Sequence, residues 1–252
     1  MKDLNDRIIR TPLPPLQTMT DDPLRALRAI RFACRFDFQL DKELEDTLSM
    51  GEVRQALSSK VSKERVYTEL NGMLTGPNPR RSLELLHSCG MFGVIFSVPE
   101  TIKEDQLDPS WTSKAMAVVR KISSLDHQTL SQMLRKEDVQ QQLVALHSLS
   151  PEWRRLVFLA AALTPLRSLS VEGGKKPLPL IEHVIRVALK GTIKDVQEVS
   201  VLLDCSEELR QVAASLPAHR EDVELKLRAA KCLRRGGEQW RLALVLAAGE
   251  LS

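Results

Sequence analysis

The sequence predicts an all-helical, elongated fold. Leu, Ala, Arg, Lys and Glu abound among its 252 residues, whereas aromatic residues make up 4% and there is a single tyrosine. That bias favours helices over a β-sandwich. Segments with a helical repeat of apolar residues follow one another along the chain and end at Gly or Pro. With 43% hydrophobic residues, the chain is apolar enough to bury a core.

The N-terminal segment and the first two helices are predicted as follows. Residues 1–20 are expected to form an entry segment, in which RTPLPP is extended and not helical because it contains three prolines. A helix then begins in DDPLRALRAIRF, with an Asp N-cap and Pro23 as its first residue, and continues to about Phe36. Another helix is expected from Asp41 through Leu48.

Further helices are predicted along the rest of the chain. SKERVYTELNGML places Val66, Leu70, Met73 and Leu74 on one helical face and is ended by TGPNP. RRSLELLHSCG predicts a short helix that ends at Gly90, and MFGVIFSVP an apolar turn. Beyond about residue 110, SLSVEGGKKPLP is the clearest loop, and amphipathic helices are expected at 108–125, 130–149, 151–166, 180–191, 195–205, 221–237 and 238–252. The last of them has no stop signal, which indicates a chain cut short.

Charge and cysteine usage narrow the class of protein. The net charge is +3, and residues 1–35 carry all of it, with four Asp against seven basic residues: Lys2, Arg7, Arg10, Arg25, Arg28, Arg31 and Arg35. We therefore expect an anionic partner at this end of the chain. Four scattered cysteines without a CxxC pair indicate free thiols in a reducing compartment. No stretch of about 18 apolar residues and no signal peptide is present, so we expect no membrane partner and an intracellular location in cytoplasm, mitochondrion or nucleus.

A ridge of arginines marks the helix that begins near Pro23. At about 100° per residue, Arg25, Arg28, Arg31 and Arg35 fall within a third of the circumference, opposite an apolar face. Composition alone favours a solvated basic face. Lysine would serve such a face equally well, however, whereas the planar guanidinium fork suits bidentate recognition of a phosphate, a carboxylate or a base edge. Both interpretations stay open on the residues alone.

Asp22 and Arg25 suggest a more specific use. Asp22 before a proline is most simply a helix N-cap. Three residues apart, however, its carboxylate and the Arg25 guanidinium also present an acceptor beside donors. Adenine and cytosine have the complementary edge, an amino donor beside a ring-nitrogen acceptor, and guanine and uracil do not. A fixed pair of this kind would accept A and C and reject G and U.

These residues resemble a known family. DDPLRALRAIRFACRF is similar to the signature E-D-x-x-R followed by R-x-x-R-F in the CCA-adding tRNA nucleotidyltransferases, which are related to poly(A) polymerases. SKERVYTELNGML resembles the next family motif, and LAAALTPLRS…KKPLPLIEHVIRVALKG resembles the body region of the eukaryotic branch. The resemblance implies a head-to-neck remnant at 1–20, a neck at 21–97 for base selection and RNA binding, a helical body at 98–200 and the start of a tail at 201–252. The catalytic head would be absent.

The resemblance also implies roles for individual residues. Asp22 and Arg25 would read the incoming base, Arg28 and Arg31 would contact the bound nucleotide, and Asp21 would support them. Arg65 and Glu69 would be a buried pair that braces the neck. In this family the head binds two Mg²⁺ ions through a D-x-D pair. The present sequence contains no D-x-D, so no catalytic or metal-binding residue is expected in this chain.

The expected function follows from the resemblance. The chain would be part of an enzyme that adds CCA to tRNA 3′ ends from CTP and ATP, and it would supply base selection and tRNA binding. Two alternatives remain open at this point: a catalytically inactive fragment that binds RNA or nucleotide, and a portion of a related poly(A)-adding polymerase. A helical scaffold without an RNA role would not require a ridge made only of arginine.

Overall fold

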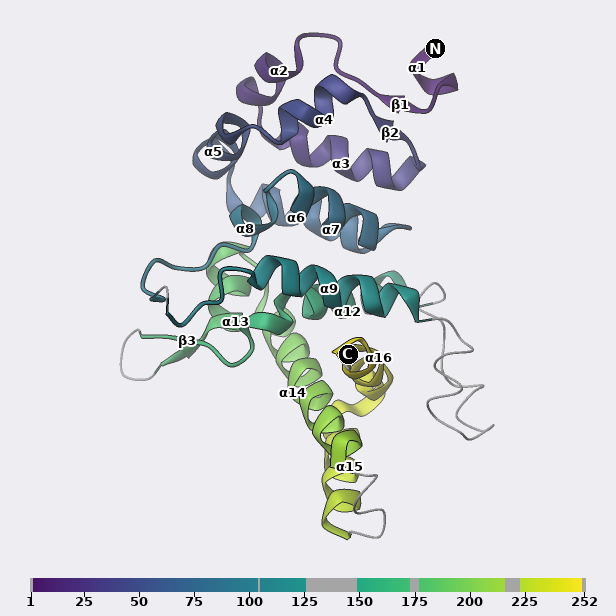
Figure 1. The fold of residues 1–252 in the computed structure, drawn as a ribbon, viewed down its shortest axis with the longest axis vertical. Helices are drawn as coiled ribbons and strands as arrows, with labels where there is room; N and C mark the ends of the chain where they lie inside the picture. The colour runs from purple at the N-terminus through teal and green to yellow at the C-terminus, as the bar shows by residue number, and fades with distance from the viewer. Residues whose placement is uncertain (1, 104, 126–148, 173–176, 216–222, 251–252) are drawn as a thin grey trace.

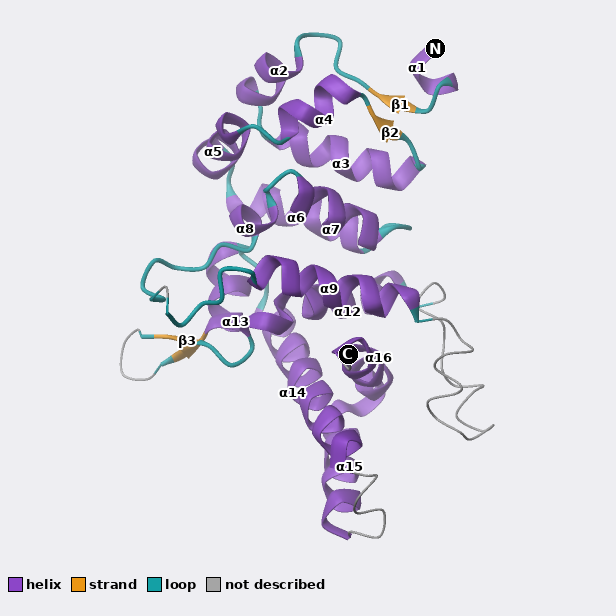
Figure 2. Cartoon of the chain, in the orientation of Figure 1, coloured by secondary structure: helices purple, strands orange, loops and turns teal. Residues whose placement is uncertain are grey.

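The computed structural model describes residues 2–103, 105–125, 149–172, 177–215 and 223–250. Helices are stacked along one long axis, with the N-terminus at one end and α15 at the other (Figure 1). Figure 2 shows that strands occur only in short pairs between the helices. Within the described residues, the predicted all-helical, elongated fold is therefore confirmed.

The extended segment predicted for RTPLPP is confirmed as far as Pro14, whereas Pro15 begins a helix that was not predicted. The structure has α1 (Lys2–Asn5), β1 (Ile8–Ile9) and α2 (Pro15–Asp21) there, and β1 pairs in parallel with β2 (Gln39–Leu40). Pro14 is the N-cap of α2 and Pro15 is its first residue. Proline is well placed at the first helical position, where its missing N–H costs nothing, so these prolines begin a helix.

Helix α3 (Leu24–Phe36) carries the arginine ridge. Its apolar side is buried and includes Leu27, Ile30 and Ala33. It ends at Asp37, which adopts the left-handed conformation with φ 54°. The helix begins one residue later than predicted, with Pro23 at the N-cap, and Asp22 is instead the C-cap of α2.

Five helices complete the upper half of the molecule. They are α4 (Lys42–Leu48), α5 (Gly51–Lys60), α6 (Lys63–Leu74), α7 (Pro79–Ser88) and α8 (Phe92–Ile95). All but α5 and α8 were predicted as helices. The four apolar residues predicted on one face of α6 are all buried, and α3 packs against both α6 and α7. Ser62 and Asn78 cap α6 and α7, since each side chain accepts a hydrogen bond from a backbone N–H.

The lower half is built on a buried helix pair, α9 (Trp111–Ser124) and α12 (Pro151–Leu163). The helix predicted at 130–149 lies almost entirely outside the described residues. A 3₁₀ turn (Thr164–Leu166) leads to β3 (Ser170–Val171), which pairs antiparallel with β4 (Leu178–Pro179), so the predicted loop contains a short hairpin. The remaining elements are α13 (Leu180–His183), a π-turn (Val184–Ala188), α14 (Ile193–Ser215), α15 (Val223–Gly236), a 3₁₀ turn (Gly237–Gln239) and α16 (Trp240–Glu250).

A polar cluster of Tyr67, Arg155 and Asp195 joins the two halves. The Tyr67 hydroxyl donates to Asp195 Oδ2 at 2.9 Å, and Arg155 Nη2 donates to Asp195 Oδ1 at 2.7 Å. Thr192 donates to the same carboxylate from both its backbone N–H and its hydroxyl, each at 2.8 Å. Burial opposes the charge on Asp195, but these hydrogen bonds outweigh it and lower its pKa. Burial, with the Asp195 contact, raises the pKa of Tyr67 to about 12.

The cysteines agree with the prediction of free thiols. Cys34, Cys89, Cys205 and Cys232 are all unpaired and buried. Burial raises the pKa values of Cys34 and Cys89. Among the described residues, no helix is long and apolar enough to cross a membrane.

Candidate functional site

Asp22 lies in the short link between α2 and α3. Its side chain makes no capping hydrogen bond at the start of α3, so the N-cap interpretation was wrong. The backbone carbonyl of Asp22, not its carboxylate, accepts from the Arg25 N–H at 3.0 Å. The Asp22 carboxylate therefore does not cap α3, and its surroundings have to be described separately.

The Asp22 carboxylate sits between two guanidinium groups. Arg25 Nε is 3.9 Å from Oδ2, and Arg65 Nη2 is 3.9 Å from Oδ1. Both distances are too long for hydrogen bonds, although the charges hold the three groups together. About half of each arginine side chain is exposed. The acceptor and the donors are thus gathered in one place and still free to bind a third group.

Arg28 and Asp21 have no side-chain partner among the described residues. Arg28 is exposed one helical turn after Arg25, on the same ridge. Its whole guanidinium is available to an anion that approaches α3. Asp21 ends α2 and is also exposed, and the structure gives it no contact through which it would support Asp22.

Arg31 differs from the other arginines of the ridge. Its Nε donates to Glu69 Oε2 of α6 at 2.6 Å, and both side chains are largely buried. The guanidinium also lies over the Phe32 ring, 4.6 Å from its centroid. Arg31 is therefore held in place, and its Nε is already engaged in the hydrogen bond to Glu69.

A glycine makes room for this contact. A Cβ atom at Gly72 would lie 2.8 Å from Arg31 Cδ, closer than such atoms approach in proteins. Sequence reasoning missed Gly72, whose position one turn after Glu69 on the same helix was the available signal.

Arg65 and Glu69 were predicted to form a buried pair with each other, and this prediction was wrong. Glu69 is buried as expected, but it pairs with Arg31 of α3, 38 residues away. Arg65 is exposed and faces Asp22. The two residues lie one turn apart on α6, so this helix contributes Arg65 to the Asp22 group and Glu69 to the neighbouring contact.

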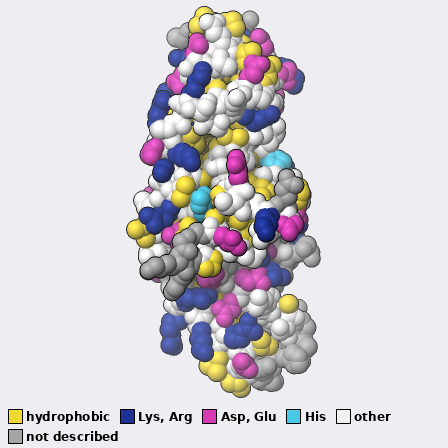
Figure 3. Space-filling view, turned by 90° about the vertical axis from the view of Figure 1, so that its left-hand side faces the viewer, with side chains coloured by type: hydrophobic (Ala, Val, Ile, Leu, Met, Phe, Trp, Pro, Cys, Tyr) yellow, Lys and Arg dark blue, Asp and Glu magenta, His cyan; other side chains and the backbone are white. Residues whose placement is uncertain are grey.

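Two features of the wider surface bear on ligands. Figure 3 shows Lys and Arg along the whole length of one face, with a group near its lower end, where α14 and α15 lie. The charge on this face therefore does not single out the N-terminal end.

Among the described residues, no three His, Cys, Asp or Glu side chains are grouped to hold a metal ion.

Sequence comparison finds relatives with a shared description. The mitochondrial CCA tRNA nucleotidyltransferase of Saccharomyces cerevisiae is 30% identical over 224 residues, which are 82% of this chain and 40% of that protein. A tRNA nucleotidyltransferase of Schizosaccharomyces pombe is 34% identical over 188 residues, 75% of this chain and 35% of that protein. By sequence, the chain is a relative of the CCA tRNA nucleotidyltransferases. It spans about two fifths of the length of these curated relatives.

A family model matches part of the chain, and a solved structure shares its fold. Residues 37–104 match the family described as the probable RNA and SrmB-binding site of polymerase A. The structure of a CCA-adding enzyme with CTP superposes with a TM-score of 0.54 at 19% identity, and it covers 100% of this chain and 48% of that one. At 19% identity this likeness shows the fold alone. The family match begins after α3, so it does not include the arginine ridge of that helix.

Proposed function

We propose that the chain is the base-selecting and tRNA-binding part of a nucleotidyltransferase that adds CCA to tRNA 3′ ends from CTP and ATP. The activity for which the two relatives are named supports the reaction. The observation that carries base selection is the Asp22 carboxylate, held between Arg25 and Arg65 without a hydrogen bond to either.

The chemistry of recognition follows from the donors and acceptors. The Asp22 carboxylate accepts the exocyclic amino group of cytosine or adenine, and the Arg25 guanidinium donates to the adjacent ring nitrogen. Guanine and uracil present a carbonyl and an N–H at these places. Acceptor would then face acceptor and donor would face donor, and each mismatch leaves desolvated groups without partners.

The other arginines have distinct parts in this proposal. Arg28, exposed and unpaired among the described residues, holds the nucleotide by its phosphates or ribose. Arg31 contacts the nucleotide only through its terminal amino groups, because Glu69 occupies Nε. Asp21 is left with a supporting role through its charge alone.

Phosphoryl transfer in this family requires metal ions, for which the resemblance implies Mg²⁺. The described residues do not fit such a site, since no three His, Cys, Asp or Glu side chains among them are grouped to hold a metal ion. In the proposal this chain therefore orients the nucleotide and the tRNA, and Mg²⁺ belongs to residues outside the described ones.

The test measures base selectivity in the 252-residue chain. Binding of CTP, ATP, UTP and GTP is compared by saturation-transfer NMR for wild type, Asp22→Ala and Arg25→Ala. Wild type is expected to prefer CTP and ATP, and both variants to lose this preference. Asp46→Ala is the matched control, because it removes an exposed carboxylate paired with Lys42 elsewhere.

Two outcomes count against the proposal. Equal binding of all four nucleotides by wild type would remove base selection from this chain. Preference for ATP alone would favour the poly(A)-adding alternative.

A further inference from the structure

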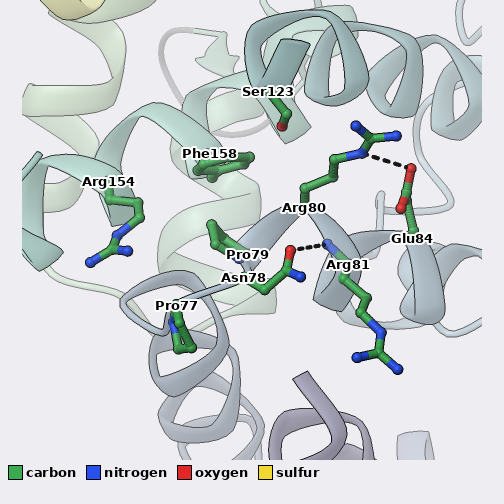
Figure 4. Close-up of a pocket in the computed structure, with 9 residues that line it drawn as sticks. All are labelled: Pro77, Asn78, Pro79, Arg80, Arg81, Glu84, Ser123, Arg154 and Phe158. Atoms are coloured by element: carbon green, nitrogen blue, oxygen red, sulfur yellow. Dashed lines mark hydrogen bonds and ion pairs between the residues drawn. The ribbon is translucent and has the colours of Figure 1, made fainter. Parts of the chain in front are cut away.

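We propose that a second site, the α7 pocket, binds a phosphate group of the RNA backbone. This inference rests on the proposed function and names a tRNA contact for it. The pocket is a cavity of about 390 Å³ where the start of α7 meets α9 and α12 (Figure 4). It is lined by Pro77, Asn78, Pro79, Arg80, Arg81, Glu84, Ser123, Arg154 and Phe158.

Arg154 of α12 is the first reason to assign an anion. Its Nε is buried and has no hydrogen-bond partner in the described part of the chain. Buried donors in folded proteins are normally satisfied, and a guanidinium binds phosphate oxygens with charge-assisted hydrogen bonds. Because Nε is buried, the terminal amino groups of Arg154 are the part of this guanidinium that would bind a phosphate in the pocket.

Arg80 supplies a second cation from the opposite wall. Its Nε donates to Glu84 Oε1 at 3.1 Å, and Arg120 Nε donates to the same oxygen at 3.1 Å. One carboxylate thus orients two guanidinium groups and neutralises only one of them. Together with Arg154, the charges around the cavity remain positive after Glu84 is counted.

The start of α7 adds donors at the floor of the cavity. Asn78 caps this ten-residue helix by accepting from the Arg81 N–H through Oδ1, so its amide NH₂ group is left to donate. The positive end of the helix dipole also favours an anion here. Arg81 itself points away from the cavity in Figure 4 and is bonded to Asp37 and to the Phe38 carbonyl. We therefore do not count it as a ligand.

The position of the pocket favours a polynucleotide over a free nucleotide. Arg65, beside Asp22, lies near the first residue of α6, and the pocket follows its last residue. The 12 residues of α6 span roughly 18 Å at 1.5 Å per residue. One nucleotide held at Asp22 does not extend that far, whereas an RNA strand places successive phosphates along the distance. The matched RNA-binding family region, residues 37–104, also includes the α7 side of the pocket.

The test measures tRNA binding as a function of salt, with tRNA that lacks its CCA end. Fluorescence anisotropy is recorded for wild type, Arg154→Ala, Arg154→Gln and Arg80→Ala. Each pocket variant is expected to bind roughly tenfold more weakly at 0.1 M salt, and the slope of log affinity against log salt should fall by about 0.7–0.9. Arg186→Ala is the matched control. Like Arg80, this exposed arginine is paired with a glutamate four residues away, in this case Glu182, but it lies outside the pocket.

Separate results distinguish the pocket from the proposed function. Wild-type affinity and slope in all three pocket variants, with unchanged melting temperatures, would overturn the pocket alone. Failure of wild type to bind tRNA would overturn both. Binding of inorganic phosphate and of CTP is measured for the same variants. Phosphate binding that the pocket variants weaken, without any effect of these variants on tRNA binding, would show a free-anion site and overturn the RNA assignment.

Discussion

The contact between Arg31 and Glu69 should be the strongest single electrostatic link between α3 and α6. The two side chains are 20% and 11% exposed, and Arg31 Nε lies 2.6 Å from Glu69 Oε2. Exposed pairs contribute about 0–1 kcal/mol, whereas removal of one partner from a buried pair costs about 3–5 kcal/mol. Since Arg31 keeps some contact with water, we expect Glu69→Ala to cost about 2–3 kcal/mol in the free energy of unfolding.

A double-mutant cycle measures this contact. Urea unfolding followed by circular dichroism is compared for Arg31→Ala, Glu69→Ala and the double variant. The double variant should lose about 2 kcal/mol less than the sum of the two single variants, because the second change removes a charge that the first left unpaired. Asp46→Ala, which breaks the exposed pair with Lys42, is the control and should cost about 0.5 kcal/mol or less. Additive losses would refute the coupling and return Arg31 to the solvated ridge.

Four further outcomes are expected. Arg28→Ala should weaken CTP, ATP, UTP and GTP alike by about 1.5–3 kcal/mol without a change in melting temperature, and a change in base preference would contradict its role. Gly72→Ala should destabilise the chain by about 1–3 kcal/mol, because the new Cβ meets Arg31; an unchanged urea midpoint would show that the side chain moves aside. The lowered pKa of Asp195 adds stability that is present above its ordinary value of 3.8 and is lost as pH falls through the lower folded value, so Asp195→Asn should be less stable at pH 7 and depend less on pH below 4. Incubation of the purified chain with CCA-less tRNA, CTP, ATP and Mg²⁺ should give no extension, and any metal-dependent product would reveal an active site that the absent D-x-D does not predict.

The periodicity of apolar residues predicted most of the helices, because the buried face of each helix is defined by residues within a single segment of the sequence. The apolar side of α3 and the four core residues of α6 follow from spacing alone. Helix α5 was missed because it buries only Val53, Ala56 and Leu57, which is a weak pattern. Helix α2 was missed for a different reason. Adjacent prolines exclude a helix before them and are compatible with one that begins at the second.

The site was predictable only where its geometry is local. Asp22 and Arg25 are three residues apart, so one helical turn brings them together. Arg25, Arg28 and Arg31 look equivalent on a helical ridge, and only the packing of α6 against one edge of α3 separates Arg31 from the others. Which helix covers which edge is a property of the tertiary fold. The sequence pattern therefore identified the ridge and could not assign Glu69 to it.

Helix α6 also connects the site to the lower helices. It presents Arg65 and Glu69 toward α3, and Tyr67, between them in sequence, to Arg155 of α12 and Asp195 of α14. These contacts all fall within residues 65–69, so a short stretch of one helix connects the Asp22 group to α12 and α14. A substitution that removes the Tyr67 hydroxyl would therefore take away a contact with the lower helices next to the two residues that face Asp22 and Arg31.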